Sequence, residues 1–301
     1  MVAIETIEQI FFPWFFWDDY EKFDSKSRIQ TMNFCEYQYK KSYVFKEKNS
    51  SYATVIGSRI HHWLEIFYDY AYLIPIEQWE LCITSEYCDY ERRMLLNFIR
   101  DEKVRLERLN YDFKIWKPLA RELKVINEEH KIRGLIDRIT GDPLVLEDYK
   151  KYLMDKYMEQ YEYGDSETKI TKKEIKVLTD IVEGKIKEIV CIGEYKTSRK
   201  VDVKSLSFEF GFYKVLLKSL PEYKDKFMIG ELINPRLNVR QFIPIQEEVY
   251  VLKALDRYRK VVESGEFKKE CNRILLHVCG RCSLEECGLY DGIDPEWNVK
   301  R

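Results

Sequence analysis

The sequence contains little glycine and proline and few histidines. Its 301 residues include 12 glycines, 8 prolines and 4 histidines. Contents this low exclude collagen-like and most disordered sequences, and the hydrophobic share of 45% at this length is enough for a sizeable core. We therefore expect a folded, soluble protein.

An excess of positive charge is also missing. The formal net charge is −2 at pH 7. Without a general basic field, a protein attracts nucleic acid only through a local basic patch. Any DNA binding by this chain must therefore come from a local patch of lysine and arginine residues.

No apolar run is long enough to span a membrane, and we find no internal repeat or low-complexity linker. Residues 1–17 contain the run IFFPWFFW, but Glu5 and Glu8 precede it and a basic leader is absent. This pattern is not that of a signal peptide. We expect the segment to pack on the core, and we expect the protein to be cytoplasmic.

Eight cysteines are present, and three of them crowd the C-terminal sequence CGRCSLEEC as Cys279, Cys282 and Cys287. In a chain without an export signal, clustered thiols indicate a metal or an iron–sulfur cluster rather than disulfides. A fourth ligand would be Cys271 nearby or Cys35 far away in the sequence, and spacing alone leaves zinc open as well. We interpret the others, Cys82, Cys88 and Cys191, as ordinary buried cysteines.

Hydrophobic periodicity predicts alternating helices and strands. We expect a helix beginning near Ser58 and others over residues 87–109, 206–220 and 247–263, and strands over 123–139, 188–197, 227–233 and 237–245. Such an order indicates one α/β domain with helical elaborations.

The domain is predicted to have three parts. Residues 1–56 form an N-terminal segment, 57–245 the core, and 246–301 a C-terminal helix with the cysteine cluster. A Lys- and Glu-rich insertion over about 144–187 interrupts the core; it opens on a strand-like PLVLEDYK and continues as helix.

The most informative stretch is KEIVCIGEYKTSRKVDVKSLSFEFGFY, residues 187–213. An apolar strand ends in Glu194-Tyr195-Lys196, and residues two apart on a strand share a face. A carboxylate beside an ammonium suits phosphodiester hydrolysis, because the carboxylate binds a divalent metal and the lysine orients water or offsets developing charge.

Two further residues are candidate metal ligands. Asp137 lies among apolar residues in the strand IRGLIDRI, where it either binds a metal or caps a turn. His61 opens the helical sequence GSRIHHWLE, where a single histidine is more often a packed side chain than a ligand. Its neighbour His62 falls on another face, and we expect it to be exposed.

Together these segments resemble the RecB-type nucleases of the PD-(D/E)XK superfamily, in particular the iron–sulfur subgroup that includes exonuclease V and CRISPR-associated RecB-like nucleases. GSRIHHWLE is similar to the family's G-x-x-x-H-x-x-L-E helix, GLID to its G-x-I-D strand, and EYKTS to its E-x-K-T motif. The resemblance implies a restriction-endonuclease-like core, a mixed central sheet flanked by helices. It also implies Mg²⁺ or Mn²⁺ bound by His61, Asp137 and Glu194, with Lys196 as a further catalytic residue.

The cysteines fit the same resemblance. FCEYQY around Cys35 is similar to the neighbourhood of the N-terminal cluster cysteine of exonuclease V. The resemblance implies a [4Fe–4S] cluster held by Cys35, Cys279, Cys282 and Cys287, an iron–sulfur staple that joins the two chain ends. The last gap is four residues where the family usually has five, so Cys271 stays an alternative ligand.

The resemblance also implies contacts with a single DNA strand. Phe208 to Tyr213 lie where the family has its Q-x-x-x-Y helix, with Glu209 in place of Gln. We expect Glu209, Tyr213 and Arg199 to contribute to DNA binding, with bases stacking on aromatic rings such as Tyr37, Tyr39 and Tyr213. Glu65, one turn after His61, is expected to orient the imidazole.

A second acid-x-Lys sequence competes with the first. Asp148-Tyr149-Lys150 follows the TGDP turn, closer in sequence to Asp137 than Glu194 is. We favour Glu194 and Lys196, because only they are followed by Thr197-Ser198-Arg199 and a helix carrying Tyr213.

The function predicted is a metal-dependent deoxyribonuclease, an exonuclease acting on single-stranded DNA ends in repair or recombination. Two alternatives stay open: a nuclease that processes CRISPR spacers, and a non-catalytic DNA-binding scaffold with a structural metal or iron–sulfur site. Expected partners are single-stranded DNA and, with it, single-strand-binding or CRISPR adaptation proteins.

Overall fold

A computed structural model of the chain describes residues 22–46, 52–163 and 169–268. The chain divides into two compact units, one from Met1–Asn49 with Val249–Arg301 and the other from Ser50–Glu248. All the predicted residues of the metal site belong to the second unit. Among the described helices, we find none with the length and apolar character needed to cross a bilayer.

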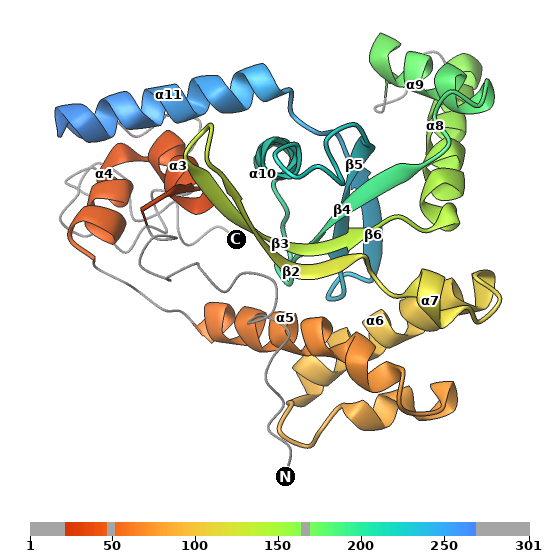
Figure 1. Cartoon of the computed structure of the whole chain (residues 1–301). Helices are drawn as coiled ribbons and strands as arrows, with labels where there is room; N and C mark the ends of the chain where they lie inside the picture. The colour runs from red at the N-terminus through yellow and green to blue at the C-terminus, as the bar shows by residue number, and fades with distance from the viewer. Residues whose placement is uncertain (1–21, 47–51, 164–168, 269–301) are drawn as a thin grey trace. The chain divides into compact units, whose positions relative to one another are not determined.

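The second unit is built on a mixed sheet (Figure 1). Its strands are β2 (Ala120–Asn127), β3 (Ile132–Thr140), β4 (Ile189–Tyr195), β5 (Phe227–Asn234) and β6 (Val239–Ile243). β3 pairs antiparallel with β2 and β4, β4 pairs parallel with β5, and β5 pairs antiparallel with β6. Every residue of the central strand β4 is buried, as expected for a strand that is covered on both faces.

Helix α10 (Val203–Leu217) makes the crossover between the parallel strands β4 and β5. It begins at Asp202, whose carboxylate accepts the backbone N–H groups of Lys204 and Ser205. The helix packs closely on the sheet at two glycines. A Cβ at Gly134 would lie 2.5 Å from Leu216, and one at Gly230 would lie 2.5 Å from the ring of Phe210.

The other face of the sheet is covered by α5 (Tyr52–Ala71), the 3₁₀ helix η2 (Ile76–Cys82), α6 (Asp89–Arg108) and α7 (Phe113–Trp116). Their core is aromatic. Phe67 stacks on Trp63 and meets Trp79, Phe98 and Trp116 edge-on, with ring centroids 5.0–6.2 Å apart. Aromatic pairs with this geometry contribute about 0.5–1.5 kcal/mol each beyond their buried area, so they stabilise the packing of these helices.

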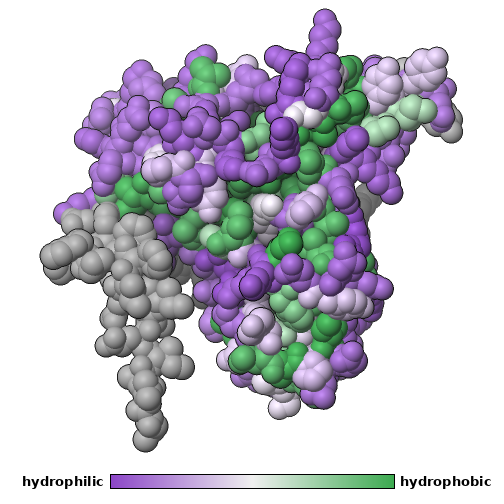
Figure 2. All heavy atoms as spheres, turned by 45° about the vertical axis from the view of Figure 1, so that its right-hand side comes forward, coloured by the Kyte–Doolittle hydropathy of each residue, from purple (hydrophilic) through white to green (hydrophobic). Residues whose placement is uncertain are grey.

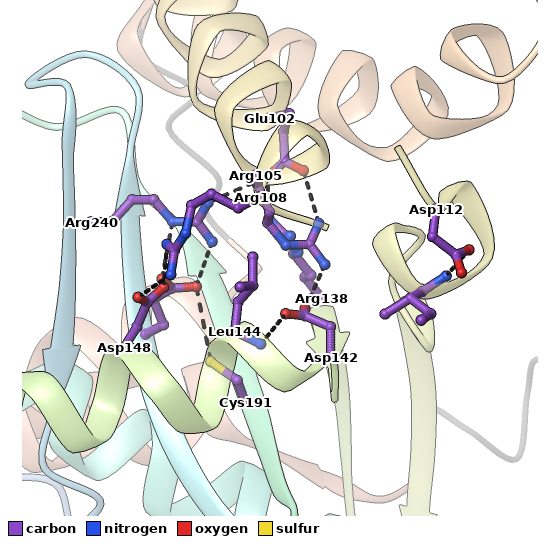
Figure 3. A network of polar contacts seen from close by, with 12 residues as sticks. Glu102, Arg105, Arg108, Asp112, Arg138, Asp142, Leu144, Asp148, Cys191 and Arg240 are labelled. Atoms are coloured by element: carbon purple, nitrogen blue, oxygen red, sulfur yellow. Dashed lines mark hydrogen bonds and ion pairs between the residues drawn. The ribbon is translucent and has the colours of Figure 1, made fainter. Parts of the chain in front are cut away.

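A network of buried charges fastens α6 to the sheet (Figure 3). Glu102 accepts hydrogen bonds from Arg138 on β3 at 2.9 Å and from Arg105 at 3.0 Å, and Arg240 on β6 lies 3.4 Å away. Burial alone would raise the pKa of Glu102, but the guanidinium groups of Arg138, Arg105 and Arg240 lower it to about 2.

Residues 143–150 are helical, so their interpretation as a strand is wrong. α8 (Pro143–Tyr163) and α9 (Lys172–Val182) lie between β3 and β4. Asp142 caps α8 by accepting the Leu144 N–H at 3.1 Å, and Pro143 suits the first helical position. The helix period brings Tyr149, Tyr152 and Leu153 onto one face, against Ile189 and Cys191 of β4.

The outer face of α8 carries large apolar side chains that the second unit leaves exposed. Met154, Tyr157, Met158 and Tyr161 have exposed fractions of 44–80%. In Figure 2, apolar residues likewise interrupt the hydrophilic surface of the face that is turned forward.

The first unit contributes β1 (Asp24–Ser25), α3 (Lys26–Phe34), α4 (Glu36–Tyr39), the π-helix η1 (Lys40–Val44) and α11 (Glu248–Ser264). Segments from the two ends of the chain bind each other here. Asp24 accepts a hydrogen bond from Arg259 at 2.9 Å, and the hydroxyls of Tyr39 and Tyr258 lie 3.0 Å apart.

The architecture agrees with the restriction-endonuclease-like core that was expected, a mixed central sheet flanked by helices. The predicted elements are present with shifted ends: the helix expected from Ser58 begins at Tyr52, and the single strand region 123–139 is the hairpin of β2 and β3. The C-terminal part of the expected iron–sulfur staple and the apolar N-terminal run lie outside the described residues.

Candidate functional site

Three potential metal ligands from three elements meet at one end of the sheet. His61 comes from α5, Glu122 from β2 and Asp137 from β3, and one ligand atom of each lies within 4.8 Å of the other two. The His61 Nδ1 atom is 3.6 Å from Asp137 Oδ2. Sequence reasoning predicted His61 and Asp137 but missed Glu122.

Glu122 reaches this site through an irregularity in β2. The antiparallel register pairs Arg121 with Arg138 and Leu123 with Ile136 but omits the pair Glu122–Asp137 between them. Glu122 has a φ of +44°, in a region that residues with a side chain rarely adopt. Other residues with positive φ, such as Asn110 and Asn238, lie in turns, whereas Glu122 lies within a strand and beside two potential ligands, where backbone strain often accompanies function. The missed signal was the hairpin itself, since folding β2 back on β3 sets Glu122 opposite Asp137.

The carboxylates of the site repel one another. Burial, and next the Glu194 carboxylate, raise the pKa of Asp137 well above its usual range. Burial, then Glu65 and Glu194, raise the pKa of Glu122 to about 7. Groups held this close are typical of sites that bind a cation or transfer a proton, because a positive charge relieves the repulsion.

Glu194 and Lys196 point together, as the strand alternation predicted. The Lys196 ammonium forms an ion pair with Glu194 Oε1. Glu194 is buried near the end of β4, whereas the Lys196 side chain is 30% exposed. The backbone N–H between them, from Tyr195, donates to Asp137 Oδ2 at 2.9 Å and so ties the E-x-K sequence to the ligand group.

Helix α10 supplies two more groups to this site. The Lys196 ammonium is 3.4 Å from Glu209 Oε2, and the Tyr213 hydroxyl lies 3.2 Å from Glu194 Oε2 and 3.3 Å from Glu209 Oε1. Glu209 and Tyr213 are four residues apart, so they share one face of the helix. Burial raises the pKa of Tyr213 well above its usual range, so its hydroxyl keeps its proton.

Two aromatic residues expected to stack on bases are buried. Tyr213 is 2% exposed and Tyr39 is 5% exposed. Stacking needs an open ring face, so neither ring can serve as a platform and that part of the prediction is wrong for both. Tyr37 is half-buried, and Arg199 is exposed in the segment after Lys196.

Two predictions around the histidines have different outcomes. His62 is exposed, as expected. The Glu65 carboxylate lies 3.5 Å from His62 Nδ1, and its expected role in orienting His61 stays a prediction. Its charge still reaches the site, because it contributes to the raised pKa of Glu122.

The rival acid-x-Lys sequence is excluded by its secondary structure. Asp148 and Lys150 lie on helix α8, where residues two apart point in different directions. Asp148 binds Arg108 of α6 through both oxygens, at 2.7 and 2.9 Å.

Four of the eight cysteines are described. Cys35 is half-buried at the start of α4, where its Sγ accepts the Gln38 N–H at 3.4 Å. Cys191 is buried, as expected, but Cys82 is half-buried and Cys88 is exposed at the N-terminus of α6, so the prediction of burial is wrong for these two. Cys271, Cys279, Cys282 and Cys287 lie outside the described residues.

A comparison with protein families gives a match over residues 25–287, to the model of the PD-(D/E)XK nuclease superfamily. The chain belongs to the PD-(D/E)XK nuclease superfamily. None of the curated proteins that were compared with it matches. The superfamily indicates a metal-dependent nuclease, a hydrolase whose members use Mg²⁺ or Mn²⁺.

The described site fits what a PD-(D/E)XK nuclease needs. An imidazole and carboxylates form a donor set that suits Mn²⁺ and Mg²⁺. The pKa values of Asp137 and Glu122 are raised by burial and by neighbouring carboxylates, and a divalent ion would relieve this repulsion. The pattern and the structure therefore agree on the class of chemistry.

Proposed function

We propose that the chain is a DNA exonuclease that hydrolyses phosphodiester bonds at single-stranded ends. The observation that carries this proposal is the ligand group of His61, Glu122 and Asp137 beside the ion pair of Glu194 and Lys196. The preference for DNA ends and a role in repair or recombination rest on the resemblance of the Cys35 neighbourhood to exonuclease V.

The metal would be held by His61, Glu122 and Asp137, with Glu194 as a further ligand. Its chemistry, when bound, is to polarise the phosphate and to lower the pKa of a water ligand. The Tyr195 N–H keeps the Asp137 carboxylate oriented at 2.9 Å. Lys196, whose side chain is 30% exposed, would hold the attacking water or offset charge on the phosphate oxygens.

The segment after β4 is fixed, which keeps Lys196 in place. The Lys196 backbone N–H donates to Ile233 O at 3.0 Å, and the Asn234 side chain donates to Ser198 O at 2.9 Å. Helix α5 lies close by, since a Cβ at Gly57 would be 3.5 Å from Thr197 Oγ1. A lysine on a rigid support loses less freedom when it meets the transition state.

For the cluster, we propose a [4Fe–4S] centre bound by Cys35, Cys279, Cys282 and Cys287. Support comes from Cys35, a free thiol that is half-buried and accepts a backbone N–H, a contact of the kind that tunes cluster sulfurs. An anaerobically purified protein should show the broad visible absorbance of such a cluster, and Cys35→Ala should lose it. A purified protein that contains one zinc ion and lacks four equivalents of iron would favour the zinc alternative.

The test of function is an assay on end-labelled single-stranded DNA with Mn²⁺ or Mg²⁺. We expect degradation by the wild type, loss of at least a hundredfold in Asp137→Ala, and normal activity in Asp225→Ala, which removes an exposed aspartate in a turn. Circular DNA of the same sequence has no ends and should survive. Cleavage of the circle would identify an endonuclease, and DNA binding without any cleavage would favour the scaffold.

A further inference from the structure

Lys196 lies between two buried carboxylates rather than beside one. Its ammonium contacts Glu194 Oε1 and both oxygens of Glu209, at 3.5 Å from Oε1 and 3.4 Å from Oε2. Both glutamates are 3% exposed. A buried carboxylate needs a charged or hydrogen-bonded partner, and Lys196 is such a partner of both.

The Tyr213 hydroxyl links the two glutamates. It is within hydrogen-bond distance of Glu194 Oε2 and of Glu209 Oε1, but it has one proton and donates to one of them at a time. The hydroxyl can therefore donate to either carboxylate, while the ammonium contacts both. Glu194, Glu209 and Tyr213 form a set with one lysine at its centre.

The two glutamates differ in their position relative to the ligand group. Glu194 lies beside the ligand group, since the N–H of the next residue, Tyr195, donates to Asp137 Oδ2 at 2.9 Å. Glu209 comes from helix α10, and the group of His61, Glu122 and Asp137 includes neither glutamate. When Glu194 serves as a further metal ligand, as proposed above, the oxygen that binds the cation gives up its bond to Lys196, whereas the contacts of Glu209 with Lys196 remain.

We propose that Glu209 is a positioning residue for Lys196, the partner that keeps the ammonium in the site when Glu194 serves as a metal ligand. The inference rests on the proposed nuclease function. Where the family pattern has a neutral Gln, this chain has the negatively charged Glu209. The Lys196 ammonium, held between two carboxylates, therefore keeps one of them when the other binds the metal.

A stability measurement tests the proposal without metal or DNA. Glu209→Gln and Lys196→Met are combined in a double-mutant cycle, measured as urea unfolding constants of the full chain in the wild-type and Glu194→Gln backgrounds. In the Glu194→Gln background we expect the unfolding constant of the double variant to differ about three- to tenfold from the value that independent single effects would give. This departure should be larger than in the wild-type background. Independent effects in that background would overturn the proposal.

Kinetics supply the second readout. In Glu209→Gln we expect kcat to fall about ten- to a hundredfold and KM to stay within about threefold, because a displaced lysine weakens the transition state more than the ground state. Glu222→Gln, the same change at an exposed turn, should leave both constants unchanged. An unchanged kcat in Glu209→Gln would overturn the proposal. If the wild type cleaves nothing, the nuclease function fails while the unfolding cycle still decides the role of Glu209.

Discussion

Glu122 combines two unfavourable features at one position of the chain. Its backbone adopts a left-handed conformation inside a strand, and its carboxylate faces other carboxylates closely enough to raise its pKa to about 7. Each feature costs on the order of 1 kcal/mol or more in the absence of a counter-ion. Their coincidence beside His61 and Asp137 indicates a residue placed for binding rather than for stability.

Removing this carboxylate should weaken metal binding. In Glu122→Gln we expect the Mn²⁺ affinity to fall more than tenfold, because a neutral amide is a weaker ligand than a carboxylate for a hard cation. Calorimetric titration measures the affinity directly. Glu128→Gln, in the exposed turn after β2, is the matched control, and equal affinities of the two variants would show that Glu122 is not a ligand.

The same residue predicts how stability depends on pH without metal. An acid whose folded-state pKa is raised binds its proton more tightly when folded, so the stability that it contributes is full below about pH 4.5 and falls until the pH passes about 7. Because Glu122 is half-buried and partly screened by solvent, we expect a loss of about 1–2 kcal/mol, less than the shift alone would give.

Melting curves in EDTA at pH 5 and pH 8 check this expectation. The wild type should lose stability relative to Glu122→Gln between the two pH values, since the variant has no titrating group at that position. A difference between the two proteins that does not change with pH would contradict the raised pKa of Glu122.

Among the elements, helix α10 packs closely on the sheet. It supplies Glu209 and Tyr213 to the site, and its Phe210 ring lies where a side chain on Gly230 would be. The helix can approach to this distance only because β5 has glycine there. Packing and catalytic geometry therefore depend on the same helix.

Gly230→Ala should destabilise the fold by about 1–3 kcal/mol, because a Cβ 2.5 Å from a fully buried ring forces the helix or the strand to move. Urea unfolding measures the change. Gly57→Ala is the comparison: its Cβ would make an ordinary 3.5 Å contact inside a helix, where alanine is preferred by about 1 kcal/mol. A Gly230→Ala variant as stable as the wild type would show that the contact with Phe210 relaxes at no cost.

At this scale the sequence predicts the elements well and their contacts poorly. Periodicity located α6, β4, β5, β6 and α11 to within a few residues, because one face of each carries the apolar side chains. It failed at residues 143–150, where an apolar run fits either a strand or a buried helix. Glu122 was missed because its role depends on strand register and a local φ, neither of which periodicity reports.

For the molecule as a whole, the second unit is held by a charge network as well as by its core. Glu102 connects α6 with β3 and β6 through Arg138 and Arg240, and Arg105 extends the chain of contacts to Asp142 at the start of α8 (Figure 3). The network unites elements that are far apart in the sequence.

Acid should therefore unfold the second unit through Glu102. Its folded-state pKa of about 2 lies below the unfolded value of 4.5, so the stability it contributes is present above about pH 4.5 and is lost as the pH falls towards 2. At neutral pH, Glu102→Gln should cost about 3–5 kcal/mol by leaving buried guanidinium groups unpaired. Chemical unfolding measures this loss, and Glu107→Gln on the exposed side of α6 should be within about 0.5 kcal/mol of the wild type.

The family and the class of reaction were also readable at this scale, because short motifs with fixed chemistry carry both. The set of groups around the lysine was not, since the contacts of Glu209 and Tyr213 with Glu194 and Lys196 arise only when α10 folds back on β4. A helix that returns to its own strand brings together residues that sequence spacing cannot relate.

The insertion of α8 and α9 between two neighbouring strands has a consequence for how the chain folds. Thr140 and Cys191 are partners in the β3–β4 ladder although 50 residues separate them. Closing a flexible loop of that length slows the search for the correct pairing. A helical hairpin forms from local contacts and returns the chain near to its starting point. Early formation of the α8–α9 pair should therefore speed the pairing of the strand bearing Asp137 with the strand bearing Glu194.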